Sequence, residues 1–250
     1  MMSLDSGVVS GQFCSMKVTY IHHSSFLIED EARTLLFDYF EGNLPRIATD
    51  RPLYVFASHR HGDHFSPVIF NLAKEVPDIR YILSADIWKK RVPTELLERT
   101  AFLKPDSDIS FDGLVVSTLK STDEGVAFLV SSENWKVYHA GDLNNWYWAE
   151  ESDDWNTKMA KSYLVQLKKL RDVNIDVAFV PVDPRLERAY SLGAEELMEA
   201  TIPTYLFPMH FWGDFSVCEK LKALWQEKGF PANVMEITRS GQVFELPLRT

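Results

Sequence analysis

Two kinds of hydrophobic pattern alternate along most of this chain. Short apolar runs, typical of β-strands, recur from Met16 onward, and stretches with apolar residues three or four positions apart, typical of helices, lie between many of them. The first three runs, at 17–21, 25–29 and 34–40, are separated by only a few residues, which predicts an antiparallel meander. The later alternation of strands and helices indicates an α/β protein.

One strand–helix–strand unit is predicted in the first half of the chain. The apolar run 53–58 precedes a helical pattern at 66–76, and the run 80–84 follows it. Ser66 is placed to cap the helix, and Pro67 suits its first turn. The loop between the first strand and the helix then lies at the carboxyl end of that strand.

The second half of the chain repeats this alternation. Strands are predicted for the apolar runs 114–120, 126–131, 136–141, 177–182 and 204–210, and helices for 157–172, 194–200 and 217–228. A closing hairpin is expected across Ser240–Gly241. The interleaved elements predict sheets in the middle and helices outside, in a four-layer αβ/βα sandwich or another α/β arrangement.

The first residues of the chain differ from the rest. Residues 1–15 are small and polar without periodicity, so we expect a disordered leader that ends where a strand opens at Met16. No linker, repeat or low-complexity stretch divides residues 16–250, which we expect to form a single domain. A hydrophobic content of 46% in 250 residues is enough for a substantial core.

Composition excludes several classes of protein. No apolar run approaches the roughly 18 residues that span a bilayer, and no signal-like segment opens the chain, so we expect a cytoplasmic protein without a transmembrane segment. The net charge of −10 argues against a broad nucleic-acid surface but leaves room for a local basic pocket. Cys14 and Cys218 are too far apart in sequence to suggest a CxxC metal site or a disulfide framework. The sequence contains no signal for an oligomeric state.

Histidine and aspartate gather in three loops that follow predicted strands. The segment ASHRHGDHF at 57–65 contains three of the seven histidines of the chain. Loops at the carboxyl ends of strands commonly hold functional groups in α/β folds, and imidazole and carboxylate are ligands for zinc, manganese and iron. The candidate ligands of one metal centre are His59, His61, Asp63, His64, Asp142 and His210.

Each of these residues alone also has a structural explanation. A loop histidine can pack against a helix end, Asp142 can cap a helix or occupy a turn, and His210 can be a satisfied core histidine. The cluster at 59–64 favours metal, because burying so many ionisable groups without a cation is costly. Gly62 supplies the tight turn that the loop needs to fold over its own ligands.

Four segments together resemble a known family. HRHGDH resembles the HxHxDH signature of the metallo-β-lactamase superfamily, YHAGD is similar to the segment with its bridging aspartate, and FPMHFWGDF is similar to the segment with its final histidine. YIHHSSFLIE resembles the opening of the branch that includes ascorbate-phosphate lactonases and N-acyl phosphatidylethanolamine phospholipases. The segments occur in the order of the family across most of residues 16–250. The resemblance implies a metallo-β-lactamase-like sandwich and a metal-dependent hydrolase.

The resemblance also implies a distribution of ligands over two metal sites. The first site would use His59 and His61, the second Asp63, His64 and His210, and Asp142 would lie between the two ions. Asp63 would also orient the nucleophile or shuttle its proton.

One loop departs from the family pattern. The family usually supplies another histidine to the first site from the loop that here reads KSTDEG, at 120–125, and this loop contains none. Asp123 is the candidate replacement, ahead of Glu124, Ser121 and Thr122. An ordinary turn is also rich in Ser, Thr, Asp and Gly, so the loop is either a source of a metal ligand or only a turn, and both interpretations remain open.

The metal content depends on this loop. A carboxylate or water in place of imidazole gives the first site a harder set of ligand atoms. Such a set favours manganese or iron over zinc. We therefore expect one or two divalent ions as cofactors, zinc or manganese first and iron as a further candidate. With both sites filled, a bridging water would lose a proton near neutral pH and attack a carbonyl or phosphoryl centre. A mononuclear centre with the ligands of the second site and Asp142 is the alternative.

Candidates for substrate binding come from three segments. By the resemblance, His23 lies at the rim of the metal pocket, although a hydrogen bond at a strand end explains it equally well. Asp183 and Arg185 follow the strand at 177–182 and either orient a substrate or stabilise their own loop as a pair. The aromatic residues at 146–148 form either a lid over the cleft or part of the core.

The leading functional hypothesis is a metal-dependent hydrolase that acts on a small-molecule ester, lactone or phosphodiester. A nuclease-like phosphodiesterase is the second hypothesis, and the acidic balance of the chain argues against it. A catalytically degenerate metal-binding scaffold is the third, because the first site lacks its usual histidine.

Overall fold

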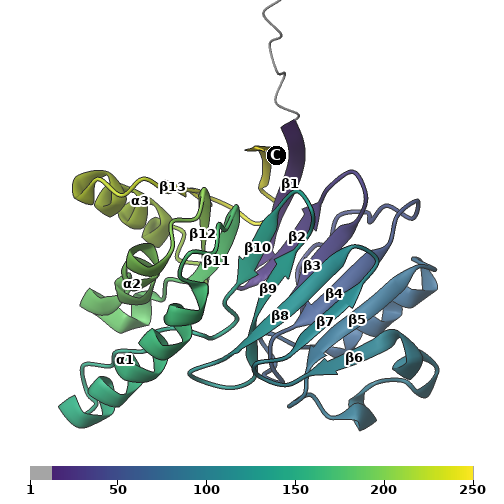
Figure 1. The fold of residues 1–250 in the computed structure, drawn as a ribbon, viewed down its shortest axis with the longest axis horizontal. Coiled ribbons are helices and arrows are strands. Elements are labelled where there is room, and N and C mark those ends of the chain that lie inside the picture. The colour runs from purple at the N-terminus through teal and green to yellow at the C-terminus, as the bar shows by residue number, and fades with distance from the viewer. Residues whose placement is uncertain (1–12, 250) are drawn as a thin grey trace, which may run out of the picture.

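A computed structural model describes residues 13–249, which form two seven-stranded sheets packed face to face (Figure 1). The strand order is β14-β1-β2-β3-β4-β5-β6 in the first sheet and β13-β12-β11-β10-β9-β8-β7 in the second. The strands of the first sheet are β1 (Phe13–His22), β2 (Ser25–Glu29), β3 (Thr34–Phe37), β4 (Leu53–Ala57), β5 (Ile79–Ser84), β6 (Thr100–Leu103) and β14 (Val243–Arg249). Those of the second are β7 (Asp108–Phe111), β8 (Leu114–Lys120), β9 (Val126–Ser131), β10 (Lys136–His139), β11 (Val177–Pro181), β12 (Tyr205–Met209) and β13 (Asn233–Val234).

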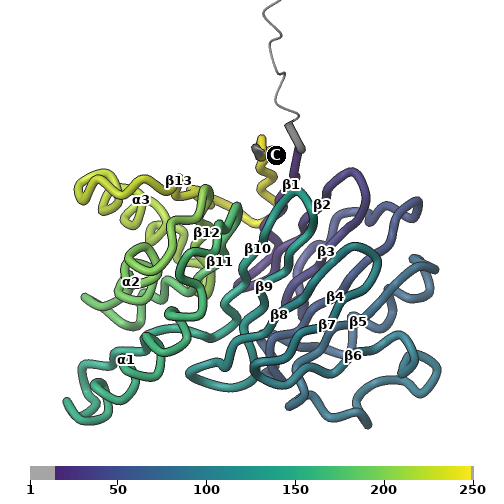
Figure 2. Tube along the Cα trace, viewed as in Figure 1, coloured from purple at the N-terminus to yellow at the C-terminus, as the bar shows by residue number. Residues whose placement is uncertain are grey.

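Helices cover the outer face of each sheet. Three α-helices pack on the second sheet, where Figures 1 and 2 show them along one side of the molecule: α1 (Asp153–Leu167), α2 (Leu192–Ala200) and α3 (Ser216–Lys228). The remaining helical segments are short 3-10 helices: η1 (Pro67–Lys74), η2 (Lys89–Arg91), η3 (Thr94–Arg99), η4 (Lys168–Leu170) and η5 (Pro184–Ala189). The four-layer αβ/βα sandwich expected from the sequence is therefore confirmed, with 3-10 helices as the layer over the first sheet.

The burial of strand β4 on both faces explains why its sequence is a continuous apolar run. Tyr54 and Phe56 belong to the core between the sheets, whereas Val55 belongs to the cluster between the first sheet and its 3-10 helices. All five residues of the strand are buried. A strand buried on both faces has no polar side, so its sequence does not alternate.

Two expectations differ from the structure near the chain ends. Strand β1 begins at Phe13 instead of Met16 because β14 pairs with it as far as Phe13↔Arg249, and residues 1–12 of the expected leader lie outside the described residues. The prediction of a closing hairpin across Ser240–Gly241 is wrong. Strand β13 pairs with β12 in the second sheet, whereas β14 pairs with β1 in the first. Both differences depend on the pairing of β14 with β1, and a local hydrophobic pattern carries no information about which strands pair.

The order of strands brings several loops to one edge of the sandwich. Strands β3, β4 and β5 run parallel in the first sheet, and β10, β11 and β12 run parallel in the second. The carboxyl ends of neighbouring parallel strands lie at the same edge, which is the usual place for a site in an open α/β sheet. Among the described residues, no helix is long and apolar enough to cross a membrane.

The loop between β8 and β9 rests directly on the end of β4. Gly125 in this loop has a φ of +70°, and a Cβ at this position would lie 2.0 Å from the carbonyl oxygen of Ser58 and 2.5 Å from the Cβ of His59. We expect Gly125→Ala to lower the free energy of unfolding by about 3 kcal/mol or more, since it adds a backbone clash to the strain of a positive φ. The measurement is urea unfolding followed by circular dichroism.

The matched control is Gly229→Ala. Gly229 also has a positive φ, of +67°, but no atom lies within 4 Å of the position of its Cβ. This variant isolates the backbone strain, which should cost about 1 kcal/mol. Equal losses for the two variants would contradict the close approach of this loop to β4.

Candidate metal centre

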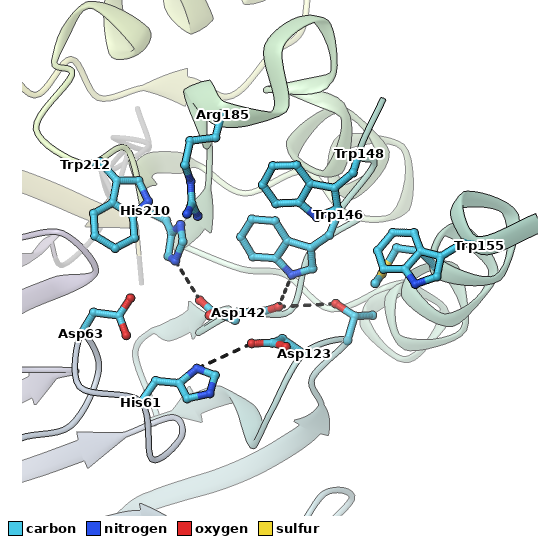
Figure 3. A pocket seen from close by; sticks show the side chains of 12 residues that line it. His61, Asp63, Asp123, Asp142, Trp146, Trp148, Trp155, Arg185, His210 and Trp212 are labelled. Carbon is cyan, nitrogen blue, oxygen red and sulfur yellow. Dashed lines mark hydrogen bonds and ion pairs between the residues drawn. The ribbon is translucent and has the colours of Figure 1, made fainter. Parts of the chain in front are cut away.

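The candidate ligands meet at the loop edge of the two sheets. Figure 3 labels those that line the pocket: His61, Asp63, Asp123, Asp142 and His210. The loop after β4 carries four of the candidate ligands, Asp142 follows β10, and His210 follows β12. Asp123 comes from the loop between β8 and β9, and His23 from the turn between β1 and β2. Segments far apart in sequence thus supply one cluster.

The first group of ligand atoms contains two histidines and two aspartates. One atom of each of these residues lies within 4.8 Å of the others: His59, His61, Asp123 and Asp142. His59 Nε2 is 3.0 Å from His61 Nδ1 and 3.5 Å from Asp142 Oδ2. Asp123 Oδ2 is 3.7 Å from His61 Nδ1, so the carboxylate from the loop that lacks a histidine lies beside this candidate ligand.

The second group contains three histidines and one aspartate. Its atoms also lie within 4.8 Å of one another: His23, Asp63, His64 and His210. Asp142 Oδ1 is 3.2 Å from His64 Nε2 and 3.4 Å from His210 Nε2. Because its other oxygen faces His59, the Asp142 carboxylate lies between the two groups.

Several atoms at this position lack a hydrogen-bond partner although they are buried. They are His23 Nε2, His64 Nε2 and Asp142 Oδ1. Leaving buried polar atoms unsatisfied is unfavourable, and buried groups without a partner are rare. Lone pairs on imidazole nitrogen and carboxylate oxygen are the donors that zinc, manganese and iron accept, so the residues present fit divalent cations.

A buried carboxylate orients the ring of His64. Asp38 Oδ2 lies 2.7 Å from His64 Nδ1, and the same carboxylate accepts hydrogen bonds from the backbone N–H and the hydroxyl of Ser58 at 2.7 and 2.6 Å. All three side chains are fully buried. A hydrogen bond at one ring nitrogen fixes the tautomer and direction of the other, so His64 Nε2 is held toward Asp142.

His210 is oriented in the same way from the other sheet. Its Nδ1 lies 2.9 Å from Asp183 Oδ2, and Asp183 is fully buried and paired with Arg185 at 2.5 Å. The Asp183–Arg185 pair that the sequence left open as an alternative to substrate binding is present. Asp183 contacts His210 behind the site, whereas the half-exposed Arg185 lines the pocket in front of it.

The electrostatics of the site favour a cation. Burial opposes ionisation of Asp142, but the neighbouring His64 and His210 outweigh it and hold the pKa of this carboxyl well below its usual value. Burial lowers the pKa of both His59 and His23 to about 4, so these rings are neutral at pH 7. Burial opposes protonation of His64, but the carboxylates of Asp142 and Asp38 raise the pKa of this ring well above its usual value, so the metal-free site itself holds positive charge beside Asp142. An ionised carboxylate and neutral imidazoles are the forms in which these groups bind metal, so an ion would take the place of that proton.

A pocket of about 480 Å³ opens over the candidate ligands (Figure 3). Its floor includes Asp63 and Asp142, and its apolar wall consists of Trp146, Trp148, Trp155, Met159 and Trp212. The indole N–H of Trp146 donates to the Asp142 carbonyl at 2.9 Å. Of the aromatic segment 146–148, the two tryptophans line this pocket and Tyr147 lines a different one.

Some residues around the site were not singled out from the sequence. Asp38 follows β3 at a carboxyl strand end, the same placement that identified Asp142, and that signal was available. Trp155 and Met159 lie four positions apart on α1 and share one face, but only the position of the helix shows that this face meets the pocket.

The sequence matches the family described as "Beta-lactamase superfamily domain" over residues 17–154, more than half of the 250 residues. The chain therefore belongs to the beta-lactamase superfamily, and the resemblance noted from its motifs is confirmed. A protein of Desulforamulus reducens described as a UPF0173 metal-dependent hydrolase is 27% identical over 222 residues, which cover 78% of this chain and 84% of the relative.

Two solved structures share the fold. Igni18, described as a novel metallo hydrolase from Ignicoccus hospitalis, has a TM-score of 0.64 at 17% identity, covering 93% of this chain and 98% of its own. CmlA, described as a diiron beta-hydroxylase from Streptomyces venezuelae, has a TM-score of 0.56 at 15% identity, covering 96% of this chain and 55% of its own. The metallo-β-lactamase-like fold expected from the sequence is thereby confirmed.

Asp38 provides a test of the buried network behind the site. Asp38→Asn keeps the shape of the side chain and tolerates its positive φ of 45°, but it removes the charge that His64 and Ser58 contact. We expect the free energy of unfolding of the metal-free protein to fall by about 2 kcal/mol, measured by urea unfolding. Asp50→Asn, at an exposed carboxylate paired with Arg51, should leave stability unchanged, and an equally stable Asp38→Asn protein would contradict the network.

Proposed function

We propose that this chain, a metal-dependent hydrolase of the beta-lactamase superfamily, hydrolyses a small ester or lactone with an apolar group. A small phosphodiester is the second candidate. The observation that carries the proposal is the Asp142 carboxylate, which lies between two groups of ligand atoms on the floor of a tryptophan-walled pocket.

The proposed centre holds two divalent ions. His59, His61 and Asp123 would hold the first ion, Asp63, His64 and His210 would hold the second, and Asp142 would contact both. When bound, such ions supply Lewis-acid polarisation of the scissile group and an activated water as the nucleophile. Zinc and manganese both suit this mixture of imidazole and carboxylate, and the naming of CmlA as a diiron enzyme keeps iron as a further candidate.

Asp63 is the proposed catalytic carboxylate. It is partly exposed to the pocket, and its Oδ2 lies 3.6 Å from His23 Nε2 and 4.0 Å from His64 Nε2. Burial opposes its ionisation, but the imidazoles of His23 and His64 outweigh this effect and lower the pKa of its carboxyl. An ionised Asp63 can accept a proton from the attacking water and return it to the leaving group.

The pocket wall supports an apolar substrate group. Trp146, Trp148 and Trp155 offer flat apolar surface, which aromatic and aliphatic groups bind by burying their own surface. Arg185 is the cation of the lining, and its guanidinium is already paired with Asp183 and lies 4.8 Å from the Trp212 ring centroid. This partial neutralisation favours an uncharged ester or lactone, whereas the exposed part of the guanidinium favours the phosphodiester as the second candidate.

A nucleic-acid substrate is less consistent with the same features. The pocket floor is formed by carboxylates, and the chain has 36 acidic residues against 26 basic ones. Long polyanions bind through many Lys and Arg contacts to phosphates. The charge distribution therefore supports a small molecule as the partner.

The proposal is tested with the purified protein, reconstituted in turn with zinc, manganese and iron(II). Ions per chain are counted by elemental analysis, and turnover is measured on aryl and alkyl esters, lactones and bis-aryl phosphodiesters. We expect two ions per chain and activity on at least one ester or lactone, with Asp63→Asn reducing kcat at least about 100-fold while the folded state is retained.

The opposite results have separate meanings. A metal-replete protein that turns over none of these substrates would contradict the proposed reaction and favour the metal-binding scaffold. Full activity of Asp63→Asn would contradict only the role of Asp63. Phosphodiesters as the sole substrates would replace the first candidate by the second.

Trp155 tests the apolar wall. Trp155→Ala removes flat apolar surface from the pocket, so we expect kcat/KM for an aryl or long-chain ester to fall about 10-fold while that for an acetyl ester stays within about twofold. Trp88→Ala is the matched control, because Trp88 is 56% exposed and lines a different pocket. Equal losses on both esters would contradict a binding role for the wall.

A further inference from the structure

We infer that His23 is a ligand of the second metal ion and not a substrate-binding residue, so that the two metal sites differ in donor type. The inference rests on the metal centre proposed above and adds to it. It assigns three imidazoles to the second site, together with Asp63, and two imidazoles with Asp123 to the first.

The position of His23 is unsuited to contact with a substrate. Its side chain is 2% exposed and is not part of the lining of the pocket over the site. Trp212 covers it, with ring centroids 4.4 Å apart, and Trp212 itself lines the pocket. A substrate in the pocket therefore meets Trp212 before it could reach His23.

The Nε2 atom of His23 is buried and has no hydrogen-bond partner. The nearest carboxylate oxygen, Asp63 Oδ2, is 3.6 Å away, which is beyond hydrogen-bond distance. One ring nitrogen of His23 lies within 4.8 Å of ligand atoms of Asp63, His64 and His210. An imidazole nitrogen without a hydrogen-bond partner can offer its lone pair to an ion at this position.

The backbone holds His23 in this direction. Its φ of +51° is in the left-handed region, which residues other than glycine rarely adopt. The His23 carbonyl accepts a hydrogen bond from the backbone N–H of His210 at 3.4 Å, and the two ring centroids are 4.2 Å apart. The turn between β1 and β2 is thus tied to the loop that carries a ligand of the second site.

The preceding residue provides an internal comparison. The His22 side chain is 40% exposed and pairs with Glu41 at 3.1 Å. Adjacent histidines therefore differ in burial and in partner. Of these two histidines, only His23 has a buried nitrogen without a hydrogen-bond partner.

The donor sets predict a difference in metal preference. With Asp142 counted at both sites, the first site has two imidazoles and two carboxylates, and the second has three imidazoles and two carboxylates. Nitrogen-rich sites suit zinc, whereas oxygen-rich sites suit manganese. The second site should therefore bind zinc more tightly than the first.

The test is zinc binding by the metal-free full-length protein, titrated against a competing chelator with a colour change. His23→Asn is the variant, since asparagine tolerates a left-handed backbone, and His22→Asn is the matched control. We expect His23→Asn to weaken the tighter of two zinc sites at least about 10-fold, and Asp123→Ala to weaken only the other. His22→Asn should bind zinc as the wild type does.

Other outcomes would contradict either the assignment of His23 as a ligand or the metal centre itself. Two unchanged zinc affinities in a folded His23→Asn protein would overturn the inference and leave the proposed hydrolase intact. A loss of turnover in that variant with unchanged zinc binding would assign His23 to positioning Asp63 and would also overturn it. Failure of the wild type to bind zinc or manganese would instead contradict the proposed metal centre itself.

A second measurement uses the wild type alone, in case His23→Asn does not fold. In protein labelled with ¹⁵N-histidine, zinc should shift the side-chain nitrogens of every histidine except His22 and His139. A third unshifted histidine, with two zinc ions bound, would overturn the inference.

Discussion

The structure of the site depends on one buried carboxylate, that of Asp142. Its two oxygens face different groups of imidazoles, with His59 on one side and His64 and His210 on the other. A buried anion is stable only if positive charge is supplied at the same place. The proposed metal centre would supply that charge, and the hydrogen bonds around the site would hold its ligands in place.

The two sheets contribute to this centre from opposite sides. Asp38 at the end of β3 orients His64 from the first sheet, and Asp183 after β11 orients His210 from the second. Gly141 lets the loop of Asp142 approach this network, because a Cβ there would lie 2.6 Å from the Cβ of Ser58. Packing between the sheets thus fixes the distances between ligands that belong to different sheets. The geometry of the site therefore depends on the packing of the core.

Local patterns in the sequence predicted an α/β protein whose candidate ligands gather at strand ends, and the family resemblance narrowed the fold to the four-layer sandwich. Continuous apolar runs identified the buried strands, and His59, His61, Asp142 and His210 followed three of them. Other features depend on long-range packing that a local pattern does not encode. Examples are the pairing of β14 with β1 and the direction of the His23 ring, which depends on a left-handed turn and a hydrogen bond to His210.

The most direct test of the account is anomalous X-ray diffraction from crystals of the protein grown with zinc, recorded above and below the zinc absorption edge. The account predicts two anomalous peaks per chain, one on each side of the Asp142 carboxylate and each about 2.0–2.2 Å from one of its oxygens. A single peak, or peaks away from Asp142, would contradict the claim that this carboxylate joins two metal sites.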